Sequence, residues 1–208
     1  MNNKILKQIE KFVLPEITSK KPVFCVTGAM ASGKNFVCQE FEKLGFISID
    51  LDKEVHKVLK EKTEDVFAAF ESIAEKQGIR IRTENNEHDR HALSSLLFSN
   101  RKLIKKHESI IYPALTENIK AFIKSTNELK ENRPKGIILN ATVLYKTPKL
   151  LDKCDLIVYV QANWIKRFNR ARKRDHMNEM HILQRFSAQK NLFEKYKQTG
   201  KQIIVVKN

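Results

Sequence analysis

A glycine-rich segment, Gly28-Ala29-Met30-Ala31-Ser32-Gly33-Lys34, constrains this chain more than any other part of it. It follows an apolar run, residues 22–27, that lacks the alternation of a half-exposed strand and so predicts a buried parallel strand. A helix is predicted from about Gly33 to Leu44. Between a strand and a helix, backbone N–H groups can surround phosphate oxygens, whose charge the Lys34 ammonium neutralises. The pattern therefore predicts a phosphate-binding loop, and its context disfavours the alternative of a glycine turn beside a surface lysine.

The loop departs from its usual pattern at one position. Loops of this kind have Ser or Thr after the lysine, with a hydroxyl that binds Mg²⁺, whereas this chain has Asn35. The carboxamide oxygen of Asn35 is also a neutral, hard ligand, but its carbonyl stands one atom further out. We therefore expect a metal at Asn35 to be shifted or to bind through a water molecule.

Two acidic residues follow a second predicted strand, residues 46–49. Alternation along an extended segment would point Asp50 and Asp52 the same way, at the edge where α/β proteins bind ligands. Asp52 is our candidate for the base that orients an acceptor hydroxyl and takes its proton during phosphoryl transfer. The alternative is that one of the two aspartates caps a helix starting near Lys53.

Three further apolar runs, residues 136–139, 156–160 and 202–206, predict the remaining strands. The fold class is therefore α/β, with a five-stranded parallel sheet flanked by helices. Residues 61–134 are expected to be nearly all helix and to form an insertion into one core, because no repeat or flexible linker interrupts the chain.

Capping residues divide this helical stretch. Thr63 precedes two acidic residues and an apolar face, which predicts an N-capped helix that stops at Gly78. Asp89 is expected to cap a helix through Phe98, and Asn100 to cap the next one, which continues toward residue 128.

Arginines crowd the helix that is predicted after the fourth strand: Arg167, Arg170, Arg172 and Arg174. Arg170 and Arg174 lie four residues apart and therefore share one helix face. Guanidinium groups suit phosphate oxygens better than ammonium groups do, so this cluster is a candidate clamp on a triphosphate. The alternative for any single arginine is a solvated helix face.

The charge of the chain agrees with an anionic ligand without identifying it. The 208 residues include 39 Lys and Arg against 24 acids, a formal net charge of +15, which favours polyanions such as nucleotides. Much of the excess is Lys scattered over predicted helix faces, so we expect solvated surface and no dedicated nucleic-acid site.

Cysteine and histidine give no sign of a metal site or a disulfide framework. Cys25, Cys38 and Cys154 form no closely spaced pair, and we expect buried, reduced thiols. The six histidines share no metal-ligand spacing and are expected at the surface or at helix caps.

The first 21 residues alternate apolar positions with Lys and Glu, which predicts a helical extension. Such a helix could lie on a membrane surface, but packing on the domain fits the spacing equally well and is commoner. No stretch approaches 18 apolar residues, and a continuous apolar leader is absent, so we expect a cytoplasmic protein without a membrane partner.

Taken together from residue 23 onward, the order of motifs resembles the dephospho-CoA kinase family. The segments that carry the resemblance are Val26-Thr27-Gly28 with Gly33-Lys34, Leu44 to Asp52, Asp89-Arg90-His91-Ala92-Leu93, Phe98-Ser99-Asn100, Tyr112-Pro113, Cys154 to Val160, Arg170 to Asp175, and Arg185-Phe186-Ser187-Ala188-Gln189. The resemblance implies a P-loop kinase fold in which residues 22–60 and 135–208 form the nucleotide-binding core, about 61–134 the helical insertion that binds the CoA substrate, and about 170–190 a lid.

The resemblance also implies the reaction, in which ATP donates its γ-phosphoryl group to the ribose 3′-hydroxyl of dephospho-CoA with Mg²⁺ bridging the phosphates. The implied catalytic residues are Asp52, Lys34 and Arg174. The implied nucleotide-binding residues are Gly28, Ala31, Ser32, Gly33, Lys34, Asn35, Phe36, Arg170 and Arg174. The residues implied to bind the acceptor are Asp50, Asp52, Arg90, Tyr112 and Gln189. The candidate metal ligand is Asn35. A monomer or weak homo-oligomer is expected.

Three residues depart from the family pattern. Asn35 replaces the metal-binding Ser or Thr, Asn140 stands where the third strand usually ends in an acid, and Tyr112 replaces the customary His. The sequence also stops at Asn208, just after the last strand, where an adenine loop usually follows, so incomplete adenine contacts are expected. Two alternatives stay open: a P-loop kinase of another small-molecule or nucleotide acceptor, and a metal-impaired relative that binds nucleotide without turnover.

Overall fold

The computed structural model describes residues 3–131, 133–175 and 179–208, with the side chains of residues 3, 174 and 175 left out. The chain divides into two compact units. Residues 1–51 and 122–208 form the first, which we call the sheet unit, and residues 52–121 form the second, the helical unit.

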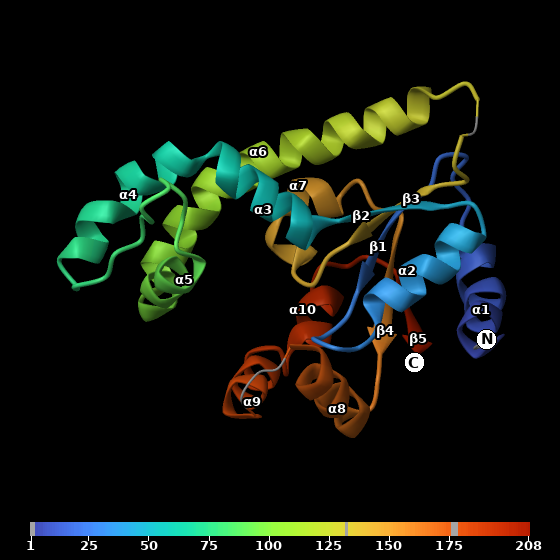
Figure 1. Ribbon diagram of the computed structural model, residues 1–208. Helices are drawn as coiled ribbons and strands as arrows, with labels where there is room; N and C mark the ends of the chain where they lie inside the picture. The colour runs from blue at the N-terminus through green and yellow to red at the C-terminus, as the bar shows by residue number, and fades with distance from the viewer. Residues whose placement is uncertain (1–2, 132, 176–178) are drawn as a thin grey trace. The chain divides into compact units, whose positions relative to one another are not determined.

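The sheet unit is built on a five-stranded, all-parallel sheet (Figure 1). Its strands are β1 (Val23–Thr27), β2 (Ile47–Asp50), β3 (Ile137–Asn140), β4 (Leu156–Gln161) and β5 (Ile203–Lys207). Each coincides with a predicted strand to within one residue at either end, so the predicted α/β fold is confirmed.

The strand order, β2-β3-β1-β4-β5, places β1 at the centre. On one side Val26 pairs with Asn140 of β3, and on the other side Thr27 pairs with Tyr159 of β4. The chain leaves β1 toward one side for β2 and β3 and later crosses to the other side for β4 and β5. The loop after β1 therefore lies at the point where the strand order reverses, which is where open α/β sheets bind ligands.

One face of the sheet is covered by helix α2 (Lys34–Lys43) and the amino-terminal helical segment: α1 (Asn3–Gln8), η1 (Ile9–Val13) and η2 (Leu14–Glu16). The rings of Phe24, Phe41 and Phe46 meet there with centroids 5.0 to 5.5 Å apart. Ile9 is fully buried in the same cluster. One face of the amino-terminal helix therefore packs on the core of the sheet unit.

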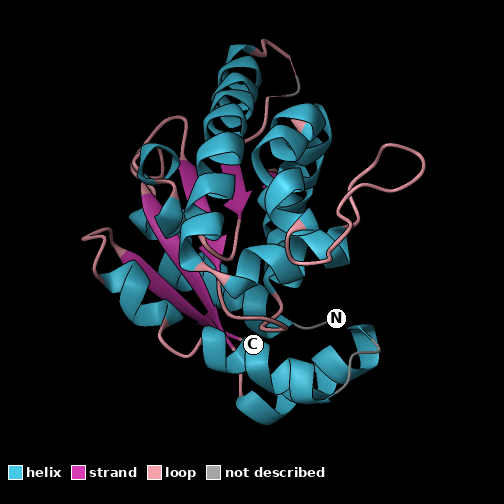
Figure 2. Ribbon diagram, turned by 90° about the vertical axis from the view of Figure 1, so that its left-hand side faces the viewer, coloured by secondary structure: helices cyan, strands magenta, loops and turns pink. Residues whose placement is uncertain are grey.

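The opposite face is covered by η3 (Leu144–Lys146), α7 (Pro148–Leu151) and α10 (Leu192–Lys197), so helices flank the sheet on both sides (Figure 2). The buried Tyr196 hydroxyl accepts a hydrogen bond from the Leu144 N–H at 2.9 Å and donates one to the Thr142 carbonyl at 3.2 Å. Burial raises the pKa of Cys38 and of Cys154 to about 12. The three cysteines are buried and unbridged, as predicted.

Between β4 and α10 lie the helices α8 (Trp164–Asp175) and α9 (Glu179–Ala188), which pack against each other. Ala171 of α8 and Ile182 and Phe186 of α9 form a small apolar cluster with Met30. The phosphate loop, which follows β1 in the chain, is therefore packed against both of these helices.

The helical unit has its own core of buried side chains, which include Phe67, Phe70, Leu96 and Ile111. The helices of this part of the chain are α3 (Leu51–Glu61), α4 (Thr63–Glu75), α5 (Arg90–Ser99) and α6 (Arg101–Glu128), which contains Pro113. None of the described helices is long and apolar enough to cross a membrane.

Two of the three predicted caps are confirmed. The Asp89 carboxylate accepts hydrogen bonds from the His91 and Ala92 N–H groups at 2.9 and 3.0 Å, and Asn100 Oδ1 accepts one from Lys102 N–H at 2.8 Å. The prediction for Thr63 was wrong, because its hydroxyl donates backwards to the Lys60 carbonyl at 2.7 Å. Thr63 is the first residue of α4 itself, where its side chain bonds the preceding turn.

Two histidines differ from the expectation of surface or capping positions. The rings of His88 and His107 lie against Phe67 and Phe70, with centroids 4.8 and 6.2 Å apart. Both Nε2 atoms are buried with no hydrogen-bond partner among the described residues. Burial is the main reason that the pKa of each ring is lowered.

Candidate active site

The backbone of the phosphate loop needs glycine at both of its ends. Gly28 has φ +151°, and a Cβ there would stand 2.4 Å from the Val160 carbonyl oxygen. Gly33 has φ +96°, and its Cβ would stand 2.0 Å from Asn208 Nδ2. Between them Ala31 has φ +60°, the left-handed region that non-glycine residues enter at a cost. The motif thus encodes a specific loop shape.

The side chains of the loop fit a phosphate group. Lys34 Nζ donates to the Gly28 carbonyl at 3.0 Å, so the ammonium reaches back across the loop. The Ser32 hydroxyl is buried, and its Oγ has no hydrogen-bond partner within the described part of the chain. A buried hydroxyl without a partner is costly unless a ligand satisfies it. The loop therefore offers a positive charge and an unused donor at one place.

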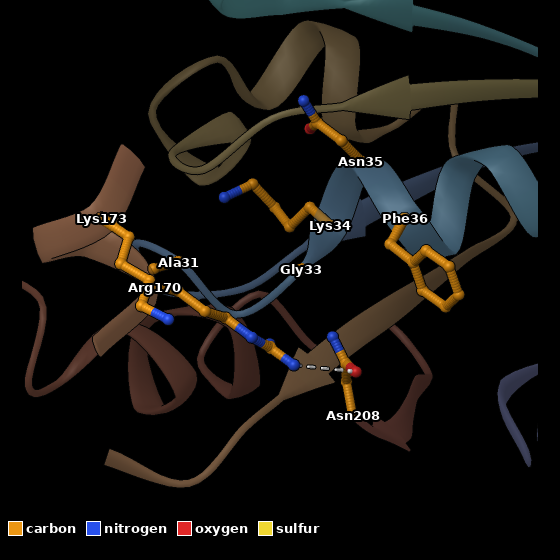
Figure 3. Close-up of a pocket in the computed structure, with 8 residues that line it drawn as sticks. All are labelled: Ala31, Gly33, Lys34, Asn35, Phe36, Arg170, Lys173 and Asn208. Atoms are coloured by element: carbon orange, nitrogen blue, oxygen red, sulfur yellow. Dashed lines mark hydrogen bonds between the residues drawn. The ribbon is translucent and has the colours of Figure 1, made fainter. Parts of the chain in front are cut away.

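A cavity of about 650 Å³ opens beside the loop, within the size range of small-molecule sites. Its lining residues are Ala31, Gly33, Lys34, Asn35, Phe36, Arg170, Lys173 and Asn208 (Figure 3). Six of these eight were candidate nucleotide-binding residues. The other two, Lys173 and Asn208, were not: Lys173 lies in the basic helix that the sequence did single out, whereas no pattern marks Asn208.

Arg170 and Asn208 meet at the carboxyl-terminal side of the loop. The Arg170 guanidinium lies 3.4 Å from both the Ser32 carbonyl oxygen and Asn208 Oδ1, and Asn208 Nδ2 donates to the Ser32 carbonyl at 2.8 Å. Three cationic side chains, those of Lys34, Arg170 and Lys173, thus line the cavity, which favours a polyanionic ligand. The side chain of Arg174, a catalytic candidate from the sequence, lies outside the described part of the structure.

The two asparagines that depart from the family pattern are hydrogen-bonded to each other. Asn140 Nδ2 donates to Asn35 Oδ1 at 2.9 Å, and Asp50 is the register partner of Asn140 on β2. An amide oxygen has two lone pairs, so Asn35 Oδ1 keeps one acceptor site beyond this bond. Amide and carboxylate oxygens are hard ligands, and these residues fit a magnesium ion. The described residues hold no group of three or more His, Cys, Asp or Glu side chains placed for a metal.

The two aspartates do not lie on one extended segment, so that part of the prediction was wrong. Asp50 is the last residue of β2, and α3 begins at the next residue, Leu51, which is buried. Asp52 is exposed in the first turn of that helix. The period-two alternation of a strand therefore does not relate the two carboxylates. Because α3 begins at Leu51, two residues before the predicted start near Lys53, Asp52 lies within the helix and does not cap it.

Two candidates for the acceptor belong to the helical unit. Arg90 is the exposed first residue of α5. Tyr112 lies in α6, where its hydroxyl donates to Glu108 Oε1 at 3.2 Å. A third candidate, Gln189, belongs to the sheet unit and contacts the phosphate loop, since its Oε1 accepts a hydrogen bond from the Met30 N–H at 2.6 Å.

Comparison with known proteins gives consistent results. The protein-family model described as dephospho-CoA kinase matches residues 23–208. A protein named dephospho-CoA kinase from Treponema denticola is 39% identical over 183 residues, which cover 88% of this chain and 80% of that protein. Two solved structures have a similar fold. TT1252 from Thermus thermophilus has a TM-score of 0.71 and 21% identity, and the match covers 91% of this chain and 90% of that one. Dephospho-CoA kinase from Campylobacter jejuni has a TM-score of 0.57 and 23% identity, and the match covers 91% of this chain and 89% of that one.

Proposed function

The chain belongs to the dephospho-CoA kinase family, and we propose that it transfers the γ-phosphoryl group of ATP to the ribose 3′-hydroxyl of dephospho-CoA. The observation that carries the proposal is the family match over residues 23–208, which includes the phosphate loop with its cationic cavity. A kinase must bind the phosphates of its donor and neutralise the charge that moves during transfer. The loop supplies groups for both tasks.

The ATP phosphates are assigned to the loop between Gly28 and Gly33, with the Ser32 hydroxyl as a further donor. Lys34 now donates to the neutral Gly28 carbonyl, and an anionic phosphate oxygen is a stronger acceptor for the same ammonium. Ala31 and Phe36 line the rest of the nucleotide cavity. Lys34 is therefore proposed both to bind the nucleotide and to stabilise charge in the transition state.

The basic helix α8 is proposed to act on the same phosphates. Arg170 lines the cavity, and Arg174 follows it by one helical turn. Guanidinium groups can bind two phosphate oxygens at once, which suits a phosphoryl group in transfer. Arg174 is proposed as the second catalytic cation beside Lys34.

Magnesium is proposed to bind at Asn35. When bound, the ion would neutralise part of the charge of the phosphates. Asn35 Oδ1 is an available hard ligand, and Asn140 and Asp50 follow at the ends of the neighbouring strands. Because Asn35 and Asn140 are neutral, the protein contributes less negative charge here than a hydroxyl-and-acid pair would.

The acceptor is proposed to meet Asp52, which acts as the base. A carboxylate orients the attacking hydroxyl and accepts its proton as the phosphoryl group arrives. Asp50, Arg90 and Tyr112 are proposed to bind the rest of dephospho-CoA, whose phosphates suit the Arg90 guanidinium.

The direct test is ADP release by the purified protein with ATP, Mg²⁺ or Mn²⁺, and dephospho-CoA. Nucleoside monophosphates and shikimate serve as alternative acceptors in parallel reactions. Turnover with dephospho-CoA alone is expected. Turnover with another acceptor instead, or ATP binding without turnover on any acceptor under either metal, would overturn the proposal in favour of a different kinase or a metal-impaired relative.

A further inference from the structure

Both backbone groups of one loop residue, Met30, are bound by side chains from distant helices. Gln189, just after α9, accepts a hydrogen bond from the Met30 N–H at 2.6 Å. The Nε of Arg167, from α8, donates to the Met30 carbonyl oxygen at 2.9 Å. Most backbone groups of this kind bond to other backbone groups. Two side chains that converge on one peptide unit therefore indicate a specific attachment.

The side chain of Met30 is held as well. It is 8% exposed and packs with Ala171 of α8 and with Ile182 and Phe186 of α9. The Arg167 guanidinium lies over the Phe186 ring, 4.2 Å from its centroid, which fixes the arginine between the loop and α9. The N–H, the carbonyl and the side chain of Met30 thus all contact the same helical pair.

The next residue shows why this attachment matters. Ala31 has φ +60°, a left-handed conformation that persists in a non-glycine residue only where its surroundings enforce it. Ser32, with its buried and unpartnered hydroxyl, follows directly. The contacts at Met30 fix the peptide immediately before this strained turn, so they hold the part of the loop that must face the phosphates.

We propose that Arg167 and Gln189 are positioning residues that hold the phosphate loop in its nucleotide-binding shape through Met30. Gln189 then acts on the ATP side of the reaction, in place of the acceptor contact that the sequence suggested. The inference rests on the proposed function for the identity of the nucleotide. It also couples α8 and α9 to the loop, because neither helix can move away without releasing Met30.

The decisive variants alter the acceptor atom of Gln189 while keeping its size. Gln189→Met keeps the length of the side chain and removes the acceptor, whereas Gln189→Glu keeps an acceptor for the Met30 N–H. Arg167→Ala removes the donor to the carbonyl, and Arg167→Lys keeps the charge without the planar fork. Gln184→Ala, at an exposed position of the same helix α9, is the matched control.

Each variant is measured in three ways: binding of a non-hydrolysable ATP analogue by calorimetry, amide hydrogen exchange of residues 28–34, and KM for dephospho-CoA. Loss of one hydrogen bond predicts that Gln189→Met and Arg167→Ala weaken ATP binding about fivefold or more. Exchange in the loop should rise in both variants, while the peptides of β3 and β5 stay protected. Gln189→Glu should stay closer to the parent, and Gln184→Ala should equal it.

The opposite pattern would overturn the proposal. A raised KM for dephospho-CoA in Gln189→Met, with unchanged ATP affinity and loop exchange, would assign Gln189 to the acceptor. Equal effects of Gln189→Glu and Gln189→Met would also overturn it, since the accepting atom would then not matter. ATP binding and loop exchange need no acceptor, so they decide the role of Met30 even if dephospho-CoA is never phosphorylated and the proposed function fails.

Discussion

Asn140 Nδ2 donates a hydrogen bond to Asn35 Oδ1 across 2.9 Å, which joins the end of β3 to the first turn of α2 behind the phosphate loop. The two residues are both departures from the family pattern, and each alone would disturb the site. A carboxylate at 140 would face the Asn35 oxygen with no proton to share. As a pair, the two amides share one hydrogen bond and add no charge of their own to the site.

Restoring the family pattern should therefore work only when both positions change. Asn35→Ser combined with Asn140→Asp adds a negative charge and a hydroxyl ligand, and should lower the Mg²⁺ concentration for half-maximal ADP release by about tenfold, equivalent to ~1.4 kcal/mol. Asn140→Asp alone should lower the free energy of unfolding, because it leaves two acceptors facing each other. Metal titration of the rate and urea unfolding of the double variant and of each single variant check both statements. An unchanged Mg²⁺ dependence in the double variant would mean that the amide pair does not limit metal binding.

Lys34→Met should abolish most of the activity while the protein stays folded. The ammonium is the only formal charge contributed by the loop itself, and removing one such group from a transition-state site costs about 100-fold or more in rate. ADP release and binding of an ATP analogue give the measurement. Lys153→Met, at an exposed position, is the control and should keep parental turnover.

Asp52→Asn should separate chemistry from nucleotide binding. Loss of a general base lowers kcat by about 100- to 10,000-fold, while the affinity for an ATP analogue should stay within about twofold. Asp50→Asn is the comparison: Asp50 ends β2 and is proposed to bind the acceptor, so this change should raise KM for dephospho-CoA more than it lowers kcat. A parental kcat in Asp52→Asn would remove Asp52 from the mechanism.

The amino-terminal helix should contribute to the stability of the sheet unit. Ile9 is fully buried against the sheet, so Ile9→Ala should lower the free energy of unfolding by about 2–5 kcal/mol. Phe12 lies on the same segment but is 49% exposed, so Phe12→Ala should lower the free energy of unfolding by much less. Chemical denaturation of both variants, monitored by circular dichroism, tests the difference.

The helical unit should lose stability as the pH falls below neutral. Burial lowers the pKa of His88 and His107 below their ordinary value of 6.5, so these rings stay neutral in the fold after they would be protonated in the unfolded chain. The unfolded state then binds more protons, and the stability that is present above pH 6.5 is lost as the pH falls from 6.5 toward the lower pKa of the folded state.

Urea unfolding between pH 8 and pH 5 measures this loss, with the hydrogen exchange of residues 63–75 as the local signal. Replacing both rings, by His88→Gln with His107→Gln, should flatten the pH profile. His91→Gln changes an exposed histidine of α5 and should leave the profile as it is. An equally steep profile without both buried rings would assign the pH dependence to other groups.

The parts of the fold that sequence could predict are those encoded by local pattern. Each buried parallel strand reads as a continuous apolar run, and Gly28, Gly33 and Gly45 mark turns whose backbone requires glycine. The Asp89 and Asn100 caps were likewise found, because the side chain and its backbone partners are close in the sequence.

The parts that sequence missed depend on tertiary contact. Asn208 meets the loop only because β5 runs parallel to β4, and Met30 is attached to Gln189 across more than 150 positions of the chain. The alternation that paired Asp50 with Asp52 failed because the strand ends at Asp50 and a helix begins at Leu51, whereas the pairing needed an extended segment through Asp52. Period-two patterns hold within a strand and give no information at its junction with a helix.

The central position of β1 has a consequence for how the protein is made. The strand that carries the phosphate loop emerges early from the ribosome, yet both of its neighbours in the sheet, β3 and β4, are synthesised only after residue 136. Until then β1 has no parallel partner, and its five buried residues are exposed to solvent and to chaperones. Nucleotide binding is thus acquired late in synthesis, and a nascent chain released before β4 would carry the complete motif without a working loop.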